Sequence, residues 1–246
     1  MEEAPKKPRS RMTWYISGAL AVIVIAAIVV TLLVTHRGGP SANAPSAQQL
    51  IKNAQTAIQN VTSYHFNLTV DNPGTGGILV IKSADGDILV PHRLKANASV
   101  LILGNVVQVQ IITIDSNQYV TDPITGNWTR TTGLLDPRSL SNSNTGVAAI
   151  LGHIQNPSSP TDANVGGTSC WSINGTLDAK YLAGITGGGA PAGSTVAVTA
   201  CIGKSDNLPY QIKMTGIAAA GDNKNTVRTF TLSKFGESLT INAPIK

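Results

Sequence analysis

The spacing of hydrophobic and polar residues changes along the chain, from a helical period to an alternating one. Over residues 46–61 apolar side chains recur every three or four positions, which predicts an amphipathic helix, and Ser46 followed by Gln49 indicates a capping box at its start. From Tyr64 to Val70 the period becomes two, because aromatic and aliphatic residues alternate with polar ones. Strand-like runs also cover residues 77–83, 87–91, 94–103, 106–114, 117–121, 165–174, 194–202, 208–218, 226–234 and 237–243.

Turn and helix signals arrange these runs into an antiparallel meander. The Asp-Gly pair at 85–86 and the Gly-Asn pair at 104–105 predict reversals of the chain between strands. Helical spacing returns in 145–154 and, more briefly, in 178–185. The pattern therefore predicts the α+β fold class, with a large antiparallel sheet and a few helices.

One uncharged segment is too long and too apolar to belong to that sheet. Residues 14–34 carry no charge, and these 21 residues, at about 1.5 Å each, span a hydrocarbon core of about 30 Å. Four basic residues precede the segment and only Arg37 closely follows it, so the positive-inside bias predicts a single-pass protein of the cell membrane with a cytoplasmic N-terminus. The predicted parts are a cytoplasmic N-terminus (1–12), a transmembrane helix (13–35), a linker (36–45) and an extracytoplasmic domain (46–246).

A cleaved signal peptide is the alternative interpretation of this segment, because Ala42-Asn43-Ala44 resembles a processing site. Two features favour an uncleaved helix: the apolar run exceeds the roughly 7–15 residues of a signal peptide, and Pro45 directly follows the site. In both cases the bulk of the protein lies beyond the membrane. No cysteine adjoins the apolar run, so attachment of a lipid to a processed N-terminal cysteine is not predicted.

The basic charge of the chain is concentrated near this segment. Five of the 18 Lys and Arg residues and two of the 13 Asp and Glu residues lie at or before Arg37. The rest of the chain therefore holds 13 basic and 11 acidic residues, a net charge of +2. Such a weak charge does not indicate a nucleic-acid partner.

The sequence contains two cysteines, Cys170 and Cys201, and both lie in strand-like runs. Outside the cytoplasm such a pair favours a disulfide over two buried free thiols, which remain the alternative. Their spacing is not that of a metal-binding pair.

A search for catalytic or cofactor motifs finds none. Hydrolase elbows, phosphate-binding loops, zinc-binding HExxH sequences and dinucleotide fingerprints are absent from the sequence. Asp85 and Asp87 flank a glycine, where an acid/base pair or a calcium site is conceivable, but a turn is the favoured interpretation. We therefore predict no enzyme activity, no catalytic residues, no metal and no cofactor.

The strongest remaining signal is a set of small aliphatic residues on one face of two predicted strands. Alternate positions from Leu94 to Ile102 carry Leu, Ala, Ala, Val and Ile, and Val107, Val109 and Ile111 share a face on the return strand. Such a face either packs into a filled core or lines a cavity. From the pattern alone a filled core is favoured.

Three segments resemble the LppX/LprAFG family of bacterial envelope lipoproteins. They are DPRSLSNSNTGVAAILGHI at 136–154, WSINGTLDAKYLAGI at 171–185 and LSKFGESLTINAP at 232–244. The resemblance implies a curved antiparallel sheet, or half-open β-barrel, with helices packed on one side around a hydrophobic cavity that binds acyl chains of lipids or glycolipids. The cavity lining that it implies is Tyr64, Phe66, Leu68, Leu94, Ala96, Ala98, Val100, Ile102, Val107, Val109 and Ile111, faced by Val147, Ile150, Leu151 and Ile154.

The predicted anchor departs from the family pattern, which uses a lipidated cysteine. A fixed anchor with a linker of about ten residues (36–45) favours a stationary acceptor or a loader beside a membrane lipid transporter over a freely shuttling carrier. Two other functions stay open: an envelope interaction or scaffolding domain with a filled core and no ligand, and a hydrolase with an unfamiliar site.

Overall fold

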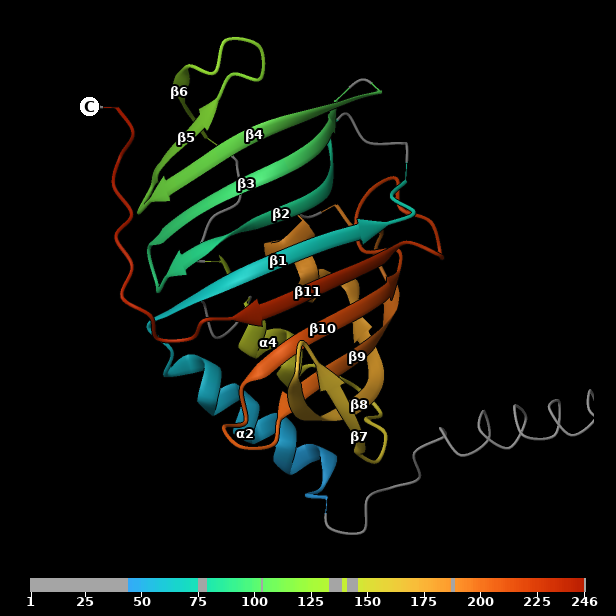
Figure 1. The fold of residues 1–246 in the computed structure, drawn as a ribbon. Coiled ribbons are helices and arrows are strands. Elements are labelled where there is room, and N and C mark those ends of the chain that lie inside the picture. Colours follow the sequence, from blue (N-terminus) through green and yellow to red (C-terminus); the bar gives the residue numbers. More distant parts are fainter. Residues whose placement is uncertain are drawn as a thin grey trace, which may run out of the picture. The chain divides into compact units, whose positions relative to one another are not determined.

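The computed structural model describes residues 44–74, 79–102, 104–132, 139–140, 146–186 and 189–245, with the side chains of Leu79 and Gly184 left aside. These residues form an eleven-stranded antiparallel sheet with helices on one side, which confirms the predicted α+β fold (Figure 1). The predicted transmembrane helix, the segment before it and most of the linker lie outside the described residues. Within the described ranges, no helix is long and apolar enough to cross a membrane.

The strands are β1 (Ser63–Asp71), β2 (Leu79–Leu89), β3 (Arg93–Ile102), β4 (Asn105–Ile114), β5 (Asn117–Thr121), β6 (Trp128–Thr131), β7 (Thr161–Val165), β8 (Thr168–Asp178), β9 (Thr195–Gly203), β10 (Pro209–Gly216) and β11 (Val227–Ser233). The helices are α2 (Ala47–Gln59), α4 (Val147–Gly152), the 3₁₀ turn η1 (Ala179–Leu182) and α5 (Ala183–Thr186).

The strand order divides the sheet into two halves. It runs β6-β5-β4-β3-β2-β1-β11-β10-β9-β8-β7, so each half is a meander of neighbours in sequence. We call β1–β6 the first half-sheet and β7–β11 the second half-sheet. The two are joined where β1 pairs antiparallel with β11, with His65 opposite Ser233 at one end and Asp71 opposite Val227 at the other.

Helix α2 forms where the helical spacing predicts it. The Ser46 hydroxyl caps its start by accepting a hydrogen bond from the Gln49 backbone N–H at 3.2 Å. The second half of the predicted capping box is replaced, because the Gln49 side chain donates instead to Asn53 Oδ1 at 2.7 Å. The apolar face of the helix is buried, including Leu50 and Ala54.

The turn predicted at 85–86 is wrong, because β2 runs through these residues without a break. Gly86 lies between Phe66 on β1 and Ala96 on β3 in the ladder. A Cβ atom placed on Gly86 would lie 2.7 Å from the Ala96 Cα atom, closer than carbon atoms approach. Glycine is therefore needed here because two strands approach each other closely. The Asp-Gly sequence at 85–86 is typical of a turn, but no turn forms.

Three other boundaries differ from the sequence prediction. The run 165–174 is broken at Gly166-Gly167, where two positive φ angles (57° and 87°) make the turn between β7 and β8. Residues 237–243 form no strand, although Ile241 is buried and its carbonyl accepts a bond from Arg93 Nη1 at 2.8 Å. Strand β6 was not predicted, because its four residues carry no clear alternation.

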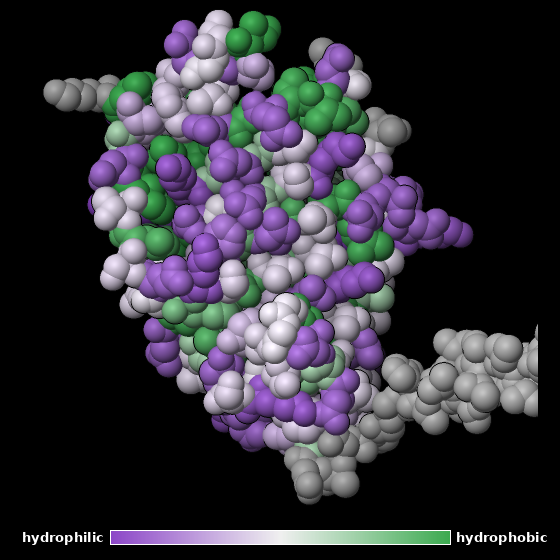
Figure 2. All heavy atoms as spheres, in the orientation of Figure 1, coloured by the Kyte–Doolittle hydropathy of each residue, from purple (hydrophilic) through white to green (hydrophobic). Residues whose placement is uncertain are grey.

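The helices cover the second half-sheet. In Figure 1, α4 lies behind the strands of this half and α2 lies alongside them at the lower left, and contacts to α2 and to β8 position α4. At its N-terminal side the Gln55 side chain of α2 donates to the Ala148 carbonyl at 3.1 Å, and after its C-terminus Gln155 forms a β-bridge with Thr176 of β8. The opposite face of the sheet carries mainly hydrophilic and intermediate residues in the view of Figure 2, with hydrophobic ones in small groups.

The predicted disulfide is confirmed. Cys170 on β8 and Cys201 on β9 are bonded, with their Cα atoms 5.5 Å apart. Both side chains are buried, and the bond lies in the second half-sheet. It cross-links two neighbouring strands that are 31 residues apart in sequence.

Candidate functional site

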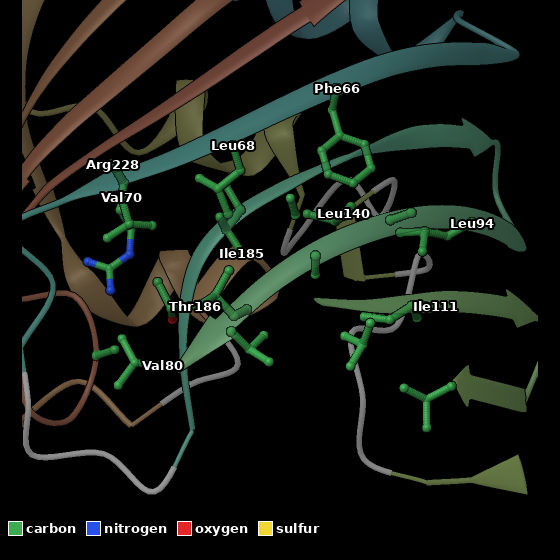
Figure 3. Close-up of a pocket in the computed structure, with 18 of the residues that line it drawn as sticks. Phe66, Leu68, Val70, Val80, Leu94, Ile111, Leu140, Ile185, Thr186 and Arg228 are labelled. Carbon is green, nitrogen blue, oxygen red and sulfur yellow. The ribbon is translucent and has the colours of Figure 1, made fainter. Parts of the chain in front are cut away.

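The first half-sheet borders a cavity of about 900 Å³. Most of the side chains around it are aliphatic or aromatic, and they come from β1–β6, β11 and five segments between strands (Figure 3). No residue of α2, α4 or β7–β10 lines it. The lining residues are Phe66, Leu68, Val70, Gly74, Val80, Ile81, Ala84, Leu94, Ala96, Ala98, Val100, Ile102, Val109, Ile111, Val120, Thr121, Asp122, Pro123, Thr129, Ser139, Leu140, Ala183, Ile185, Thr186, Ala219, Ala220, Asp222, Arg228 and Phe230.

Nine of the fifteen residues predicted as a lining lie on the wall of this cavity. They belong to β1, β3 and β4, at alternate positions that share one apolar face of each strand. The nine are Phe66, Leu68, Leu94, Ala96, Ala98, Val100, Ile102, Val109 and Ile111. That these residues contact a lipid stays a prediction.

The structure places the other six predicted lining residues away from the cavity. Tyr64 is buried further along β1, with its ring centroid 6.5 Å from that of Phe235, and Val107 is a half-buried residue packed against the core. The remaining four belong to α4 and the residues just after it, which the bridge to β8 holds against the second half-sheet. These four are Val147, Ile150, Leu151 and Ile154.

Other segments supply the remaining walls of the cavity. Leu140 lies on one side, and Ala183, Ile185 and Thr186 follow the short turn η1 after β8. The sequence predicted a short helix at 178–185 but did not place its residues in a cavity, because so short a helix does not show which of its faces is buried. Val70 and Ala84 were also missed, although each continues the alternation of its strand; the mistaken turn at 85–86 hid the second of them.

Small side chains leave the space of the cavity open. Ala98 on β3 lies between Ala84 on β2 and Val109 on β4 in the ladder, and all three line the cavity. One position along the same face, Gly86 and Ala96 are neighbours. Leucine or phenylalanine at these positions would fill the volume, so the row of small residues keeps this part of the sheet from forming a filled core.

One ion pair interrupts the apolar wall. Arg228 Nη1 and Nη2 donate to the two carboxylate oxygens of Asp222 at 2.6 and 2.9 Å, and the two side chains are only 8% and 3% exposed. Asp222 Oδ2 also accepts bonds from the backbone N–H groups of Ala218 and Ala219. Burial by itself would raise the pKa of Asp222, but the bonds from Arg228 and from the two amides outweigh it and hold this pKa below its usual range.

The Arg228 side chain could have been found from the sequence. Along β11 the buried positions are Arg228, Phe230 and Leu232, which alternate with half-buried ones. A charged residue at an inward position of an otherwise apolar strand is a signal for a functional site.

Polar groups also border the cavity near β5 and β6. Asp122 Oδ1 accepts bonds from the backbone N–H groups of Ile124 and Thr125 and from the Thr125 hydroxyl, and these bonds lower the pKa of Asp122. Thr121 Oγ1 accepts a bond from the Gln110 backbone N–H at 2.8 Å. Both oxygens therefore serve the local turn and ladder.

The acidic pair considered for catalysis or calcium lies outside the cavity. His65 is located between the two carboxylates, with Nδ1 2.8 Å from Asp87 Oδ1 and Nε2 3.1 Å from Asp85 Oδ2. None of these three residues lines the cavity. Within the described ranges, no group of three or more His, Cys, Asp or Glu residues is placed to hold a metal ion.

The comparisons with known proteins agree with this architecture. The family model described as LppX_LprAFG lipoprotein matches residues 46–241, which is most of the chain. The chain belongs to the LppX_LprAFG lipoprotein family. Membership of LppX_LprAFG confirms the resemblance read from the three sequence segments, whereas the predicted transmembrane anchor lies outside the matched residues.

Two curated proteins that are similar in sequence to this chain come from Mycobacterium tuberculosis. The chain is 24% identical over 230 residues to the lipoarabinomannan carrier protein LprG of Mycobacterium tuberculosis, which covers 92% of this chain and 93% of LprG. It is also 24% identical over 193 residues to the putative diacylated glycolipid transporter LprF of the same species, with coverage of 72% and 70%. Both names describe carriers or transporters of lipids, and neither describes an enzyme.

Two solved structures show the LppX_LprAFG fold. The crystal structure of LprF from Mycobacterium bovis aligns with a TM-score of 0.68 at 22% identity, covering 85% of this chain and all of LprF. That of the lipoprotein LppX from Mycobacterium tuberculosis aligns with a TM-score of 0.58 at 20% identity, covering 80% and 98%. These likenesses confirm the open, curved antiparallel sheet.

Proposed function

We propose that this protein is a membrane-tethered lipid-binding protein of the cell envelope. Its extracytoplasmic domain, residues 46–246, holds the acyl chains of lipids or glycolipids in the cavity and helps to transfer them within the envelope. The names of two relatives support this function, since LprG is named a lipoarabinomannan carrier protein and LprF a putative diacylated glycolipid transporter. The predicted span at 13–35 would keep the domain at the membrane surface.

The observation that carries the proposal is the cavity of about 900 Å³ with its apolar wall. Ligand-binding pockets have volumes of about 300–1,000 Å³ and are lined mainly by hydrophobic side chains. A scaffolding domain, the alternative function, would have no use for a cavity of this size, because an unfilled apolar space lowers the stability of the fold.

The physical chemistry of acyl chains gives such a cavity its use. Exposing one methylene group to water costs about 0.8 kcal/mol, so a chain of about 16 carbons faces a barrier on the order of 10 kcal/mol in the aqueous envelope. A sheath of aliphatic side chains removes most of that barrier. With the tether that we propose, the protein would act as a stationary acceptor or as a loader beside a membrane lipid transporter.

The test of the function is a lipid inventory of the purified protein. The full-length chain is expressed in a bacterial membrane, transferred into amphipol, and extracted for lipid mass spectrometry. The matched control is a membrane protein of similar size with a filled domain, prepared in the same way. We expect acyl lipid in a near-stoichiometric amount above the control. A protein that carries no lipid and takes up no fluorescent acyl lipid would contradict the proposed function.

A further inference from the structure

The buried ion pair lies where the proposed ligand would be. Arg228 occupies an inward position of β11, and its ladder neighbour on β1 is Val70, which also lines the cavity. In Figure 3 its guanidinium lies beside Val70, with Val80 and Thr186 nearby, whereas Phe66 and Leu94 are at the far end of the view. The cavity therefore has one charged pair in a largely aliphatic surround.

Burying the Arg228–Asp222 ion pair costs hydration free energy, so we expect the pair to have a role that offsets this cost. Each ion loses several kcal/mol of hydration in a protein interior, and replacing such a pair with apolar residues often leaves stability unchanged or raises it. The loop before β11 explains Asp222, whose Oδ2 atom accepts bonds from the backbone N–H groups of Ala218 and Ala219. It does not explain Arg228, because the ladders to β1 and β10 already hold β11.

The bonds within the pair leave hydrogen-bond donors for a ligand. A guanidinium has five N–H groups, and within the described residues Arg228 donates two bonds, both to Asp222. The carboxylate is more fully used, because Oδ2 accepts three bonds and Oδ1 accepts one. A ligand at this position would therefore meet mainly N–H donors.

The charge of the pair selects the kind of acceptor. Arg228 and Asp222 neutralise each other, so an anion bound beside them would leave an uncompensated negative charge in an apolar cavity, which is unfavourable. An uncharged carbonyl oxygen makes the hydrogen bond without that penalty. In an acylated lipid, the ester carbonyl is the uncharged acceptor attached directly to the hydrophobic chain.

We propose that Arg228, oriented by Asp222, forms an ester-binding subsite of the cavity and donates a hydrogen bond to an ester carbonyl of the acyl lipid. This inference rests on the proposed function and adds the chemical class of the ligand: the acyl chain fills the apolar space and the ester marks where the chain ends. Chains joined through ether linkages lack this carbonyl and are disfavoured.

The test compares two lipids that differ only in this carbonyl. The full-length chain in amphipol is loaded with a fluorescent acyl probe, which is displaced by dioleoylglycerol (ester) or by the chain-matched dioleyl diether. A hydrogen bond to a charged donor is worth about 1.5–3 kcal/mol, so we expect the ester to bind about tenfold or more tightly than the ether. In Arg228→Met the ratio of the two affinities should fall to about one.

Lys213→Met is the matched control, because it removes the same charge from an exposed position of β10; its ester-to-ether ratio should equal that of the parent. If Arg228 only fastens the loop before β11, Arg228→Met will melt at a lower temperature with an unchanged ratio, and the subsite is refuted. Equal binding of ester and ether by the parent also refutes it while leaving the proposed function intact. Failure of the parent to bind either lipid refutes both.

A second variant keeps the test decisive if Arg228→Met does not fold. Asp222→Asn retains an oxygen for the backbone N–H groups of Ala218 and Ala219 but leaves the guanidinium charge unbalanced. Its affinity for dioleoyl phosphatidic acid relative to dioleoylglycerol should rise about tenfold over the parent. An unchanged preference would show that Arg228 does not face the ligand.

Discussion

The two half-sheets share the same alternation of apolar and polar residues, but the inner face is packed in one half and borders a cavity in the other. In the second half-sheet, inward residues such as Ile173, Leu177 and Ile212 are fully buried against a layer that contains α2 and α4. In the first half-sheet the inward residues border a cavity of about 900 Å³. An apolar face of a sheet therefore does not by itself determine whether the space next to it is filled. That depends on which helices pack against the face.

The size of the inward side chains matches this division. The first half-sheet places Ala84, Ala96 and Ala98 next to one another on its inner face, with Gly86 beside them. The disulfide lies in the second half-sheet, where it joins β8 to β9. The second half-sheet thus stabilises the fold, whereas the small side chains of the first half-sheet pack less fully and leave space for the cavity. Four predictions test this comparison.

The largest effect is expected from truncating a leucine in the filled half. Leu177 on β8 and Leu94 on β3 are both fully buried, but only Leu94 lines the cavity. Leu177→Ala should lower the free energy of unfolding by about 3–5 kcal/mol, because it creates a void in a packed core. Leu94→Ala should cost about 1–3 kcal/mol, because the space that it opens joins the existing cavity instead of forming a new void in a filled core. Urea denaturation followed by circular dichroism measures both, and equal losses would mean that the halves are packed alike.

Removing the disulfide should be the next largest effect on stability, without an effect on ligand uptake. The double variant Cys170→Ala/Cys201→Ala should unfold with about 2–4 kcal/mol less free energy, because the bond closes a loop of 31 residues. Lipid uptake should match the parent below the melting temperature, because neither cysteine lines the cavity. A loss of uptake in a variant that is still folded would show that the halves are coupled.

A bulky residue in the cavity wall should weaken lipid binding and leave the fold intact, which is the reverse of the effect expected from removing the disulfide. Ala98→Trp adds an indole in the middle of the first half-sheet, so acyl-lipid affinity should fall at least tenfold, about 1.4 kcal/mol, while the fold remains intact. Asn97→Trp is the matched control, because the neighbouring side chain is exposed on the other face of the same strand. Fluorescent-lipid titration measures both. Unchanged uptake in Ala98→Trp would remove this face from the ligand site.

The smallest effect concerns acid stability. The lowered pKa of Asp222 means that the folded state binds its proton more weakly than the unfolded state, so its contribution is present above the ordinary aspartate pKa of about 4 and disappears as the pH falls through the folded value. The melting temperature of Asp222→Asn should therefore be lower than that of the parent at pH 7, and the gap should narrow below about pH 4. A gap that is constant from pH 7 to pH 3 would exclude ionisation of Asp222 as its source.

Much of the fold could be predicted because, in these segments, the secondary structure that the local pattern favours is also the one that the folded protein adopts. Ser46 and the helical spacing after it predicted α2, and the alternation in 64–70, 94–103 and 106–114 predicted β1, β3 and β4. The two cysteines predicted their own bond. Where a local signal had a tertiary cause, the prediction failed: Gly86 is required by the approach of β3 and not by a turn.

The sequence by itself determined which faces of the strands are apolar, since alternation is a property of the extended chain. It could not determine which of those faces would be covered. Val147, Ile150, Leu151 and Ile154 are apolar enough to face either half, and the bridge between Gln155 and Thr176 holds them in the second half-sheet. Only the tertiary structure decided that the first half-sheet borders a cavity and that Arg228 and Asp222, six residues apart in sequence, meet at its wall. The physical reason is that contacts across strands and around loops are not encoded in the period of any one segment.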